Sequence, residues 1–127
     1  MIEDILNRRR LDRFFVRSAL QQDQFWFYDG QKIVVSRDRR TRFVISLVSP
    51  NQINTQGQVM IGTDLISISV YKRNGFIDIR PDRSLSISNA AETLVMPFSR
   101  FDGGFEIGDE GVLYSDENGG GDRWELA

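Results

Sequence analysis

Residues 64–80, DLISISVYKRNGFIDIR, contain the pattern that decides the fold. Apolar and polar residues alternate on both sides of Asn74-Gly75, and alternation with a period of two is typical of a strand with one buried face. Asn-Gly is the dipeptide most typical of a two-residue hairpin turn, in which both turn residues need a positive φ. The stretch therefore predicts two antiparallel strands joined at Asn74-Gly75.

The same alternation predicts the register of this hairpin. With a two-residue loop, Arg73 faces Phe76 and Val70 faces Ile79. One side of the hairpin then carries aliphatic residues and the other mostly polar ones. The aliphatic side holds Ile66, Ile68, Val70, Ile77 and Ile79, and the other holds Ser67, Ser69, Tyr71, Asp78 and Arg80. A slip of one residue would mix the two sides, so the pattern favours this pairing over its neighbours.

Similar patterns recur along the rest of the chain. Residues 25–28 (FWFY), Asp29-Gly30 and residues 31–36 (QKIVVS) predict a second hairpin with a two-residue loop, in which Trp26 faces Ile33. Further short strands are expected at residues 43–48, 85–88, 94–98, 105–107 and 111–114. Many short strands separated by turn residues are typical of an antiparallel sandwich or small barrel. We therefore expect a mainly β fold.

The N-terminal segment has a different pattern. Ile2, Ile5 and Leu6 lie at helical spacing, with acidic residues before them and arginines after them. This predicts an α-helix from residue 2 to about 12, and the longer alternative is a helix that continues to about Leu20. At 127 residues the chain suits one domain. We divide it into a helical segment (1–22), a β domain (23–114) and a C-terminal tail (115–127), and the long polar loop 51–58 is a candidate contact site.

The composition argues against most reaction chemistry. The chain has no cysteine and no histidine, so it lacks disulfides, thiolate metal sites, a cysteine nucleophile, the commonest general base and the usual transition-metal ligand. It also has neither of the common glycine-rich phosphate-binding motifs. We therefore expect a protein that is not an enzyme and that uses no metal or cofactor.

The sequence also bears on location. No apolar run approaches the roughly 18 residues that a membrane-spanning helix needs. The first ten residues, MIEDILNRRR, place acids before bases and are followed by no apolar stretch, unlike a secretory signal peptide. We expect no membrane partner, no secretion through a signal peptide, and a location in the cytoplasm or in a virion.

The arginines are the first candidate interface. The net charge of −2 hides an asymmetry, because residues 1–42 hold ten bases and six acids. Nine arginines form two clusters there: Arg8, Arg9, Arg10, Arg13 and Arg17, and then Arg37, Arg39, Arg40 and Arg42. The planar guanidinium suits carboxylates and phosphates. We expect these arginines to pair with carboxylates, within the chain or across an interface. If the two clusters met in space, they could instead line a nucleic-acid backbone. The third interpretation is a charged face in contact with solvent alone.

The acidic C-terminus is the second candidate interface. From Phe101 onward the chain holds eight acids and a single base. Asp116, Glu117 and Asp122 are the predicted charged contacts, and Trp124 and Leu126 are the predicted apolar anchors on a neighbouring subunit. Asp116 opens a stretch that resembles the start of a calcium loop, but the twelfth position is Ala127 instead of the bidentate glutamate. We therefore expect no metal here.

These features together favour a non-enzymatic structural or assembly protein. We expect a small β subunit of a homo-oligomer or larger particle, in which the basic N-terminal segment of one copy contacts the acidic C-terminal segment of another. The lack of cysteine and histidine and the polar loops suit a virion component, such as a capsid cement, neck, connector or tail protein. Two alternatives remain: a nucleic-acid-binding or regulatory module that uses the arginine clusters, and a small acidic inhibitor of a host enzyme.

Overall fold

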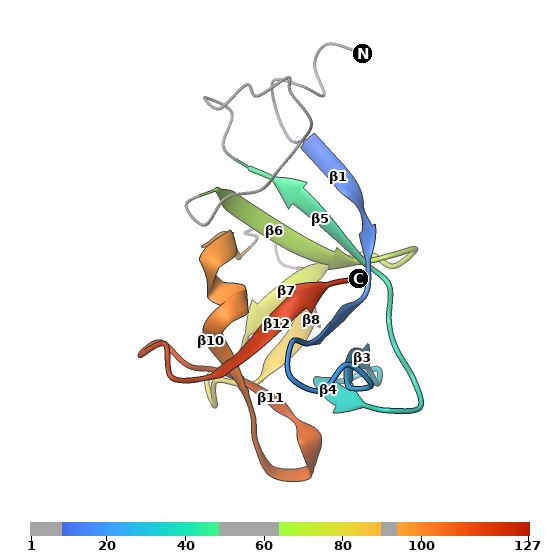
Figure 1. The fold of residues 1–127 in the computed structure, drawn as a ribbon. Helices are drawn as coiled ribbons and strands as arrows, with labels where there is room; N and C mark the ends of the chain where they lie inside the picture. The colour runs from blue at the N-terminus through green and yellow to red at the C-terminus, as the bar shows by residue number, and fades with distance from the viewer. Residues whose placement is uncertain (1–8, 49–63, 90–93) are drawn as a thin grey trace.

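The computed structural model describes residues 9–48, 64–89 and 94–127, and only the backbone of residues 9–12 (Figure 1). These residues form twelve short strands and two 3₁₀ helices. The strands are β1 (Arg9–Phe14), β2 (Val16–Ser18), β3 (Phe25–Tyr28), β4 (Ile33–Ser36), β5 (Phe43–Leu47), β6 (Leu65–Val70), β7 (Phe76–Ile79), β8 (Leu85–Ser88), β9 (Met96–Pro97), β10 (Asp102–Ile107), β11 (Leu113–Ser115) and β12 (Asp122–Leu126); the 3₁₀ helices are η1 (Phe98–Phe101) and η2 (Asp109–Gly111). The predicted mainly β, antiparallel fold is confirmed.

The strands form two antiparallel sheets. In the first sheet the order is β1-β5-β6-β7-β8, with β9 also paired to β6, and in the second it is β11-β10-β12-β2-β3-β4. Backbone pairing of Val34 with Val112 brings the two ends of the second sheet together, so that this sheet is nearly closed and barrel-like. Pairing of Ser84 with Tyr114 links it to the first sheet. The chain also crosses from the first sheet to the second at Phe15, which lies between β1 and β2.

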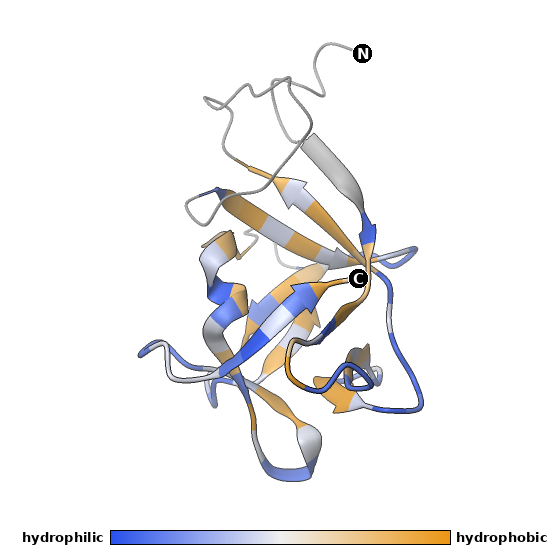
Figure 2. Cartoon of the chain, viewed as in Figure 1, coloured by the Kyte–Doolittle hydropathy of each residue, from blue (hydrophilic) through white to orange (hydrophobic). Residues whose placement is uncertain are grey.

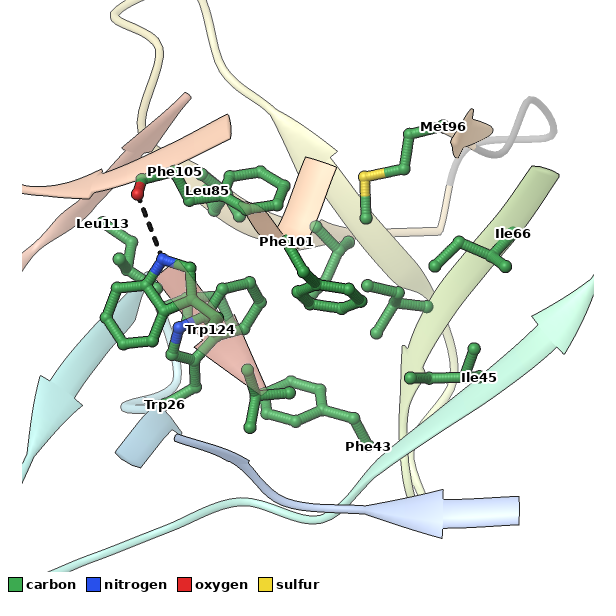
Figure 3. Close-up of a cluster of buried hydrophobic side chains, with 14 of the residues drawn as sticks. Trp26, Phe43, Ile45, Ile66, Leu85, Met96, Phe101, Phe105, Leu113 and Trp124 are labelled. Atoms are coloured by element: carbon green, nitrogen blue, oxygen red, sulfur yellow. Dashed lines mark hydrogen bonds between the residues drawn. The ribbon is translucent and has the colours of Figure 1, made fainter. Parts of the chain in front are cut away.

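Both sheets contribute to one core. The ring of Trp26 is fully buried, and its centroid lies 5.3 Å from that of Phe105, 5.7 Å from Trp124 and 6.0 Å from Phe43. Figure 3 shows these rings beside the aliphatic side chains of β5 and β6 and the indole N–H of Trp124, which donates to the Phe105 carbonyl at 3.0 Å. Edge-to-face aromatic contacts of this kind add about 0.5–1.5 kcal/mol each to the burial of the rings.

The hairpin predicted at residues 64–80 forms as β6 and β7, but its register is wrong. Ser69, and not Arg73, pairs with Phe76. The backbone N–H of Tyr71 donates to the Arg42 carbonyl, and Lys72 takes the positive φ expected at Asn74, so the loop is longer than two residues. Because the register is shifted by an even number of residues, each side chain stays on its predicted face of the hairpin. The side chains of Ile66, Ile68, Val70 and Ile77 are all buried.

The second hairpin differs from its prediction in the same way. Tyr28 pairs with Ile33 where Trp26 was expected, so the loop holds four residues, Asp29 to Lys32. The Asp29 carboxylate accepts the backbone N–H groups of Gln31 at 2.8 Å and Lys32 at 2.9 Å, and Gly30 has a φ of 100°. An aspartate that bonds the backbone of the residues after it stabilises such a turn. The strands predicted at 43–48, 85–88, 94–98, 105–107 and 111–114 correspond to β5, β8, β9, β10 and β11.

The helix predicted toward Leu20 is wrong where the structure describes the chain. Residues 9–14 and 16–18 are the strands β1 and β2. Val16 and Ser18 are buried while Arg13 is exposed and Arg17 is half-buried, which is the alternation of a strand. Residues 2–8, where the helical spacing begins, and the polar loop 51–58 lie outside the described residues.

The predicted C-terminal tail is instead an interior strand. β12 lies between β10 and β2 in the second sheet. The last residue, Ala127, accepts the N–H of Phe15 at 3.0 Å and donates its own N–H to the Phe15 carbonyl at 2.8 Å. Figure 1 accordingly places the C-terminus beside the β1–β2 crossing. Residues 122–126, predicted as part of a C-terminal tail, therefore belong to the second sheet.

We expect Gly121→Ala to destabilise the fold by about 1–3 kcal/mol, the usual effect of overpacking. A Cβ at Gly121 would lie 2.5 Å from the Phe105 carbonyl oxygen, which is backbone and cannot turn away. Gly120→Ala is the control, because its Cβ would meet only the Asp116 carboxylate at 3.4 Å. Urea denaturation followed by tryptophan fluorescence measures both. Equal midpoints for the two variants would contradict the placement of β12.

We expect Trp124→Ala to lower the free energy of unfolding by about 3–5 kcal/mol, as for other buried aromatic truncations. Its side chain is 6% exposed and belongs to the core, whereas the control, Leu20, is 80% exposed. Leu20→Ala should change stability by less than about 0.5 kcal/mol. Thermal unfolding followed by circular dichroism compares the two variants. A Trp124→Ala protein as stable as the parent would show that the C-terminal strand leaves the sheet.

Candidate functional site: an arginine–aromatic face

Three phenylalanine rings lie on the outer side of the second sheet. In β3, Phe25 and Phe27 alternate with the buried Trp26, so they point away from the core. Phe15, at the crossing between β1 and β2, meets Phe25 edge to face with ring centroids 6.2 Å apart. All three rings are half-buried.

Arginines cover these three rings. The guanidinium carbon of Arg40 lies 4.6 Å from the ring centroid of Phe15 and 5.1 Å from that of Phe25. Arg42 lies 4.7 Å from Phe15, and Arg39 lies 5.6 Å from Phe27. We call this surface the arginine–aromatic face; it consists of Arg39, Arg40, Arg42, Phe15, Phe25 and Phe27.

The chain between β4 and β5 is shaped to place these arginines. Thr41 donates its N–H to the Trp26 carbonyl at 3.1 Å, and its hydroxyl accepts the N–H of Tyr28 at 2.9 Å. The segment therefore runs beside β3 with Thr41 bound to it, and Arg40 and Arg42 flank Thr41 on the outside. Figure 2 shows this connection as a hydrophilic stretch between two largely apolar strands.

A second basic–aromatic pair adjoins the face. Arg13 donates from Nη1 to the Tyr71 hydroxyl at 2.7 Å, and its guanidinium carbon lies 4.8 Å from the Tyr71 ring centroid. The backbone bond from Tyr71 to Arg42 joins this pair to the face. The two arginine clusters of the sequence thus meet in space through Arg13, Arg40 and Arg42.

The charge environment divides the arginines into two groups. Arg17 Nε lies 2.6 Å from Glu125 Oε2, and Arg37 pairs with Asp23. These two match the predicted pairing with carboxylates inside the chain. In contrast, Arg39, Arg40 and Arg42 are exposed and form no ion pair with any carboxylate in the described part of the chain. Arg8 lies outside the described residues, and Arg9 and Arg10 are known only as backbone in β1.

Most of the C-terminal residues predicted to form an interface contact their own chain. Asp116 accepts the N–H of Asn118 at 2.9 Å, Asp122 accepts that of Ile107 at 3.1 Å, and Glu117 is exposed. Trp124 is buried in the core and Leu126 packs against it. Trp124 is therefore not free to anchor a neighbouring subunit, which corrects that expectation: strand pairing of 122–126 turns its indole inward.

A pocket of about 380 Å³ lies where the β3–β4 loop of the second sheet meets β8 of the first. Tyr28, Lys32, Arg80, Ser86 and Ile87 are among the residues that line it. The Ser86 hydroxyl donates to the Gln31 carbonyl, and Lys32 Nζ lies 3.7 Å from Asp82 Oδ2, so two contacts hold the walls together. Sequence reasoning did not select these residues, because nothing in their spacing brings the two loops together.

Two carboxylates beside this pocket remain ionised to low pH. The backbone N–H groups of Lys32 and Gln31 lower the pKa of Asp29, because they stabilise the charged form. The hydroxyl and the backbone N–H of Ser84 lower the pKa of Asp82 in the same way. At neutral pH both groups are therefore negative and hold their loops in place.

Comparison with protein-family models, characterised proteins and solved structures finds no match for this chain. Within residues 9–48, 64–89 and 94–127, no group of three acidic side chains is placed to hold a metal ion. The same residues include no helix with the length and apolar character required to cross a membrane.

We expect Asp29→Ala to destabilise the protein at neutral pH and to do so less as the solution is acidified. The folded-state pKa of Asp29 is lowered from 3.8, so its contribution is present above that value and is lost as pH falls through the folded-state pKa. Urea denaturation of both proteins at several pH values measures the difference. Asp38→Ala is the control, because the Asp38 carboxylate is exposed and forms no ion pair or hydrogen bond among the described residues. A difference that grew on acidification would contradict the turn geometry.

Proposed function

We propose that this protein is a non-enzymatic binding protein that holds a single-stranded nucleic acid on the arginine–aromatic face. The observation that carries the proposal is Arg40, whose exposed guanidinium lies over two phenylalanine rings without a carboxylate partner among the described residues. Grooves that bind single strands combine cations that follow the backbone with aromatic side chains. The face has both elements.

Stacking prepares these arginines for an anion. An exposed cation–π contact contributes about 0.5–1 kcal/mol and fixes the plane of the guanidinium. The N–H groups at its edge can then donate to a phosphate in a bidentate manner, with less side-chain entropy left to lose on binding. The free face of such a guanidinium can also stack on an unpaired base.

The acidic character of the whole chain does not oppose this proposal. Among the described residues, Arg17, Arg37 and Arg123 lie near carboxylates, and all three lie outside the face. Arg40 and Arg42 meet over the ring of Phe15, so positive charge gathers in one place on a protein with a net charge of −2. A local patch of one sign attracts a charged ligand whatever the total charge is.

The test is the affinity for a short fluorescein-labelled single-stranded DNA, measured by anisotropy at increasing salt. We expect binding at low salt that weakens as salt rises, with a slope of about −0.7 per neutralised phosphate. Arg40→Gln combined with Arg42→Gln should weaken binding and make the slope shallower by about 1.4. Arg40→Lys keeps the positive charge but removes the planar guanidinium. This variant should therefore retain the salt slope and lose part of the affinity for DNA.

Arg123→Gln is the matched control, because it removes an exposed arginine that lies 3.3 Å from Asp102 instead of on the face. It should leave the salt slope unchanged. Absence of binding at low salt would overturn the proposal, and so would equal losses in the control and in the variants of the face.

Assembly with other copies of the chain is the second candidate function. It is favoured by one observation: the cationic face coexists with Asp109, Glu110 and Glu117, which are exposed and form no ion pair among the described residues. Such complementary surfaces make head-to-tail contacts. Light scattering at increasing concentration tests it. Self-association that both salt and the Arg40→Gln/Arg42→Gln variant abolish would favour assembly, whereas a monomer at all concentrations would remove it. Membership of a virion stays a prediction from composition.

A further inference from the structure

We infer that the pocket between the β3–β4 loop and β8 receives one nucleotide of the bound strand, with its phosphate at Lys32 and Arg80 and its base inside. This inference rests on the proposed function, because the strand on the arginine–aromatic face supplies the nucleotide. It assigns a ligand to a surface that the face itself does not include.

The rim of the pocket offers positive charge. Arg80 is exposed and has no ion pair with a described carboxylate. Lys32 lies 3.7 Å from Asp82, a long contact in which the lysine side chain keeps 37% of its exposure. A phosphate between these two cations would meet one unpaired and one weakly paired positive charge, with the ionised carboxylates of Asp29 and Asp82 beside the pocket.

The interior offers hydrogen-bond acceptors. The Tyr28 hydroxyl donates its proton to the Gly30 carbonyl at 3.0 Å, and the Ser86 hydroxyl donates to the Gln31 carbonyl. Both protons are in use, so the two hydroxyl oxygens are left as acceptors. Acceptors suit the N–H groups of a base and not a phosphate, and the Ile87 side chain gives the ring an apolar wall.

The size and rigidity of the pocket suit such a ligand. Its volume of about 380 Å³ lies in the range of small-molecule sites, which is roughly 300–1,000 Å³. Its walls are set before binding, because Asp29 fixes the β3–β4 loop and the Ser84 hydroxyl holds Asp82 at 2.6 Å. Binding to a prepared pocket loses less conformational entropy.

The β6–β7 loop connects the pocket with the arginine–aromatic face. Tyr28, which lines the pocket, lies on the opposite face of β3 from Phe27, so the connection does not run along β3 itself. Arg73 from the β6–β7 loop lies 5.5 Å from the Tyr28 ring centroid, and Tyr71, two residues earlier, is bonded to Arg13 and to Arg42. A bound strand that passes Arg42 would thus meet Arg73 before it reaches Lys32 and Arg80.

The experiment uses the full chain and two readouts. Amide shifts of Gly30, Gln31 and Lys32 in ¹H–¹⁵N spectra are followed on addition of cytidine 5′-monophosphate, adenosine 5′-monophosphate or inorganic phosphate. The affinity of the Arg80→Gln variant for the labelled single-stranded DNA is then measured by anisotropy. Arg123→Gln is the control, because it changes the net charge by the same amount. Arg80 is exposed, so its replacement should leave the fold intact.

We expect the mononucleotides to shift these amides at lower concentration than inorganic phosphate. Arg80→Gln should weaken both mononucleotide and DNA binding about tenfold, the effect of one lost charge-assisted hydrogen bond. The inference is overturned if phosphate binds as tightly as the nucleotides, or if DNA binding depends on Arg40 but not on Arg80. If DNA does not bind even at low salt, the proposed function fails first and this inference fails with it.

Discussion

The indole of Trp26 is the contact on which the rest of the structure depends. It belongs to the second sheet, yet it packs edge to face against Phe43 of the first sheet and against Phe105 and Trp124 of its own. Its contacts add to the Ser84–Tyr114 pairing and to the rest of the shared core in fixing the relative position of the two sheets. A large ring at their centre supplies contacts to both at once, and burial of such a side chain contributes several kcal/mol.

The position of Trp26 also accounts for the surface on which the proposed function rests. Side chains alternate along β3, so burial of Trp26 turns Phe25 and Phe27 outward. No further sheet layer among the described residues covers these two rings. The segment from Arg37 to Arg42 covers them instead, because Thr41 binds the backbone of β3 on both sides of Phe27. The buried core and the arginine–aromatic face thus lie on opposite sides of β3.

Pairing of the remaining charges keeps that face distinct. The C-terminal strand brings Glu125 to Arg17, and Asp23 lies against Arg37, so these arginines have partners inside the chain. Arg39, Arg40 and Arg42 are left with aromatic rings beneath them. A guanidinium held by a ring keeps its full charge and its hydrogen-bond donors, whereas one paired with a carboxylate has both already engaged. The proposal of an anionic partner follows from this difference between arginines that look alike in the sequence.

The sequence by itself determined the strands β3 to β11 and the faces of the central hairpin. Alternation at Ile66, Ile68 and Ile77 marks a buried side whichever residue lies opposite, because the side-chain period is two. It did not determine register, since Tyr71 bonds Arg42 and Asp29 bonds Lys32 to lengthen loops that Asn-Gly and Asp-Gly would otherwise close. The sequence-based assignment of β1 and β2 was wrong. It extended the helical spacing of Ile2, Ile5 and Leu6 into residues whose pattern is that of a strand. Only tertiary structure decided that Trp124 lies in the core, that Arg40 stacks on Phe15, and that Lys32 and Arg80 line the same pocket. Those contacts join segments far apart in the chain, and a local pattern carries no information about which distant segment a side chain will meet.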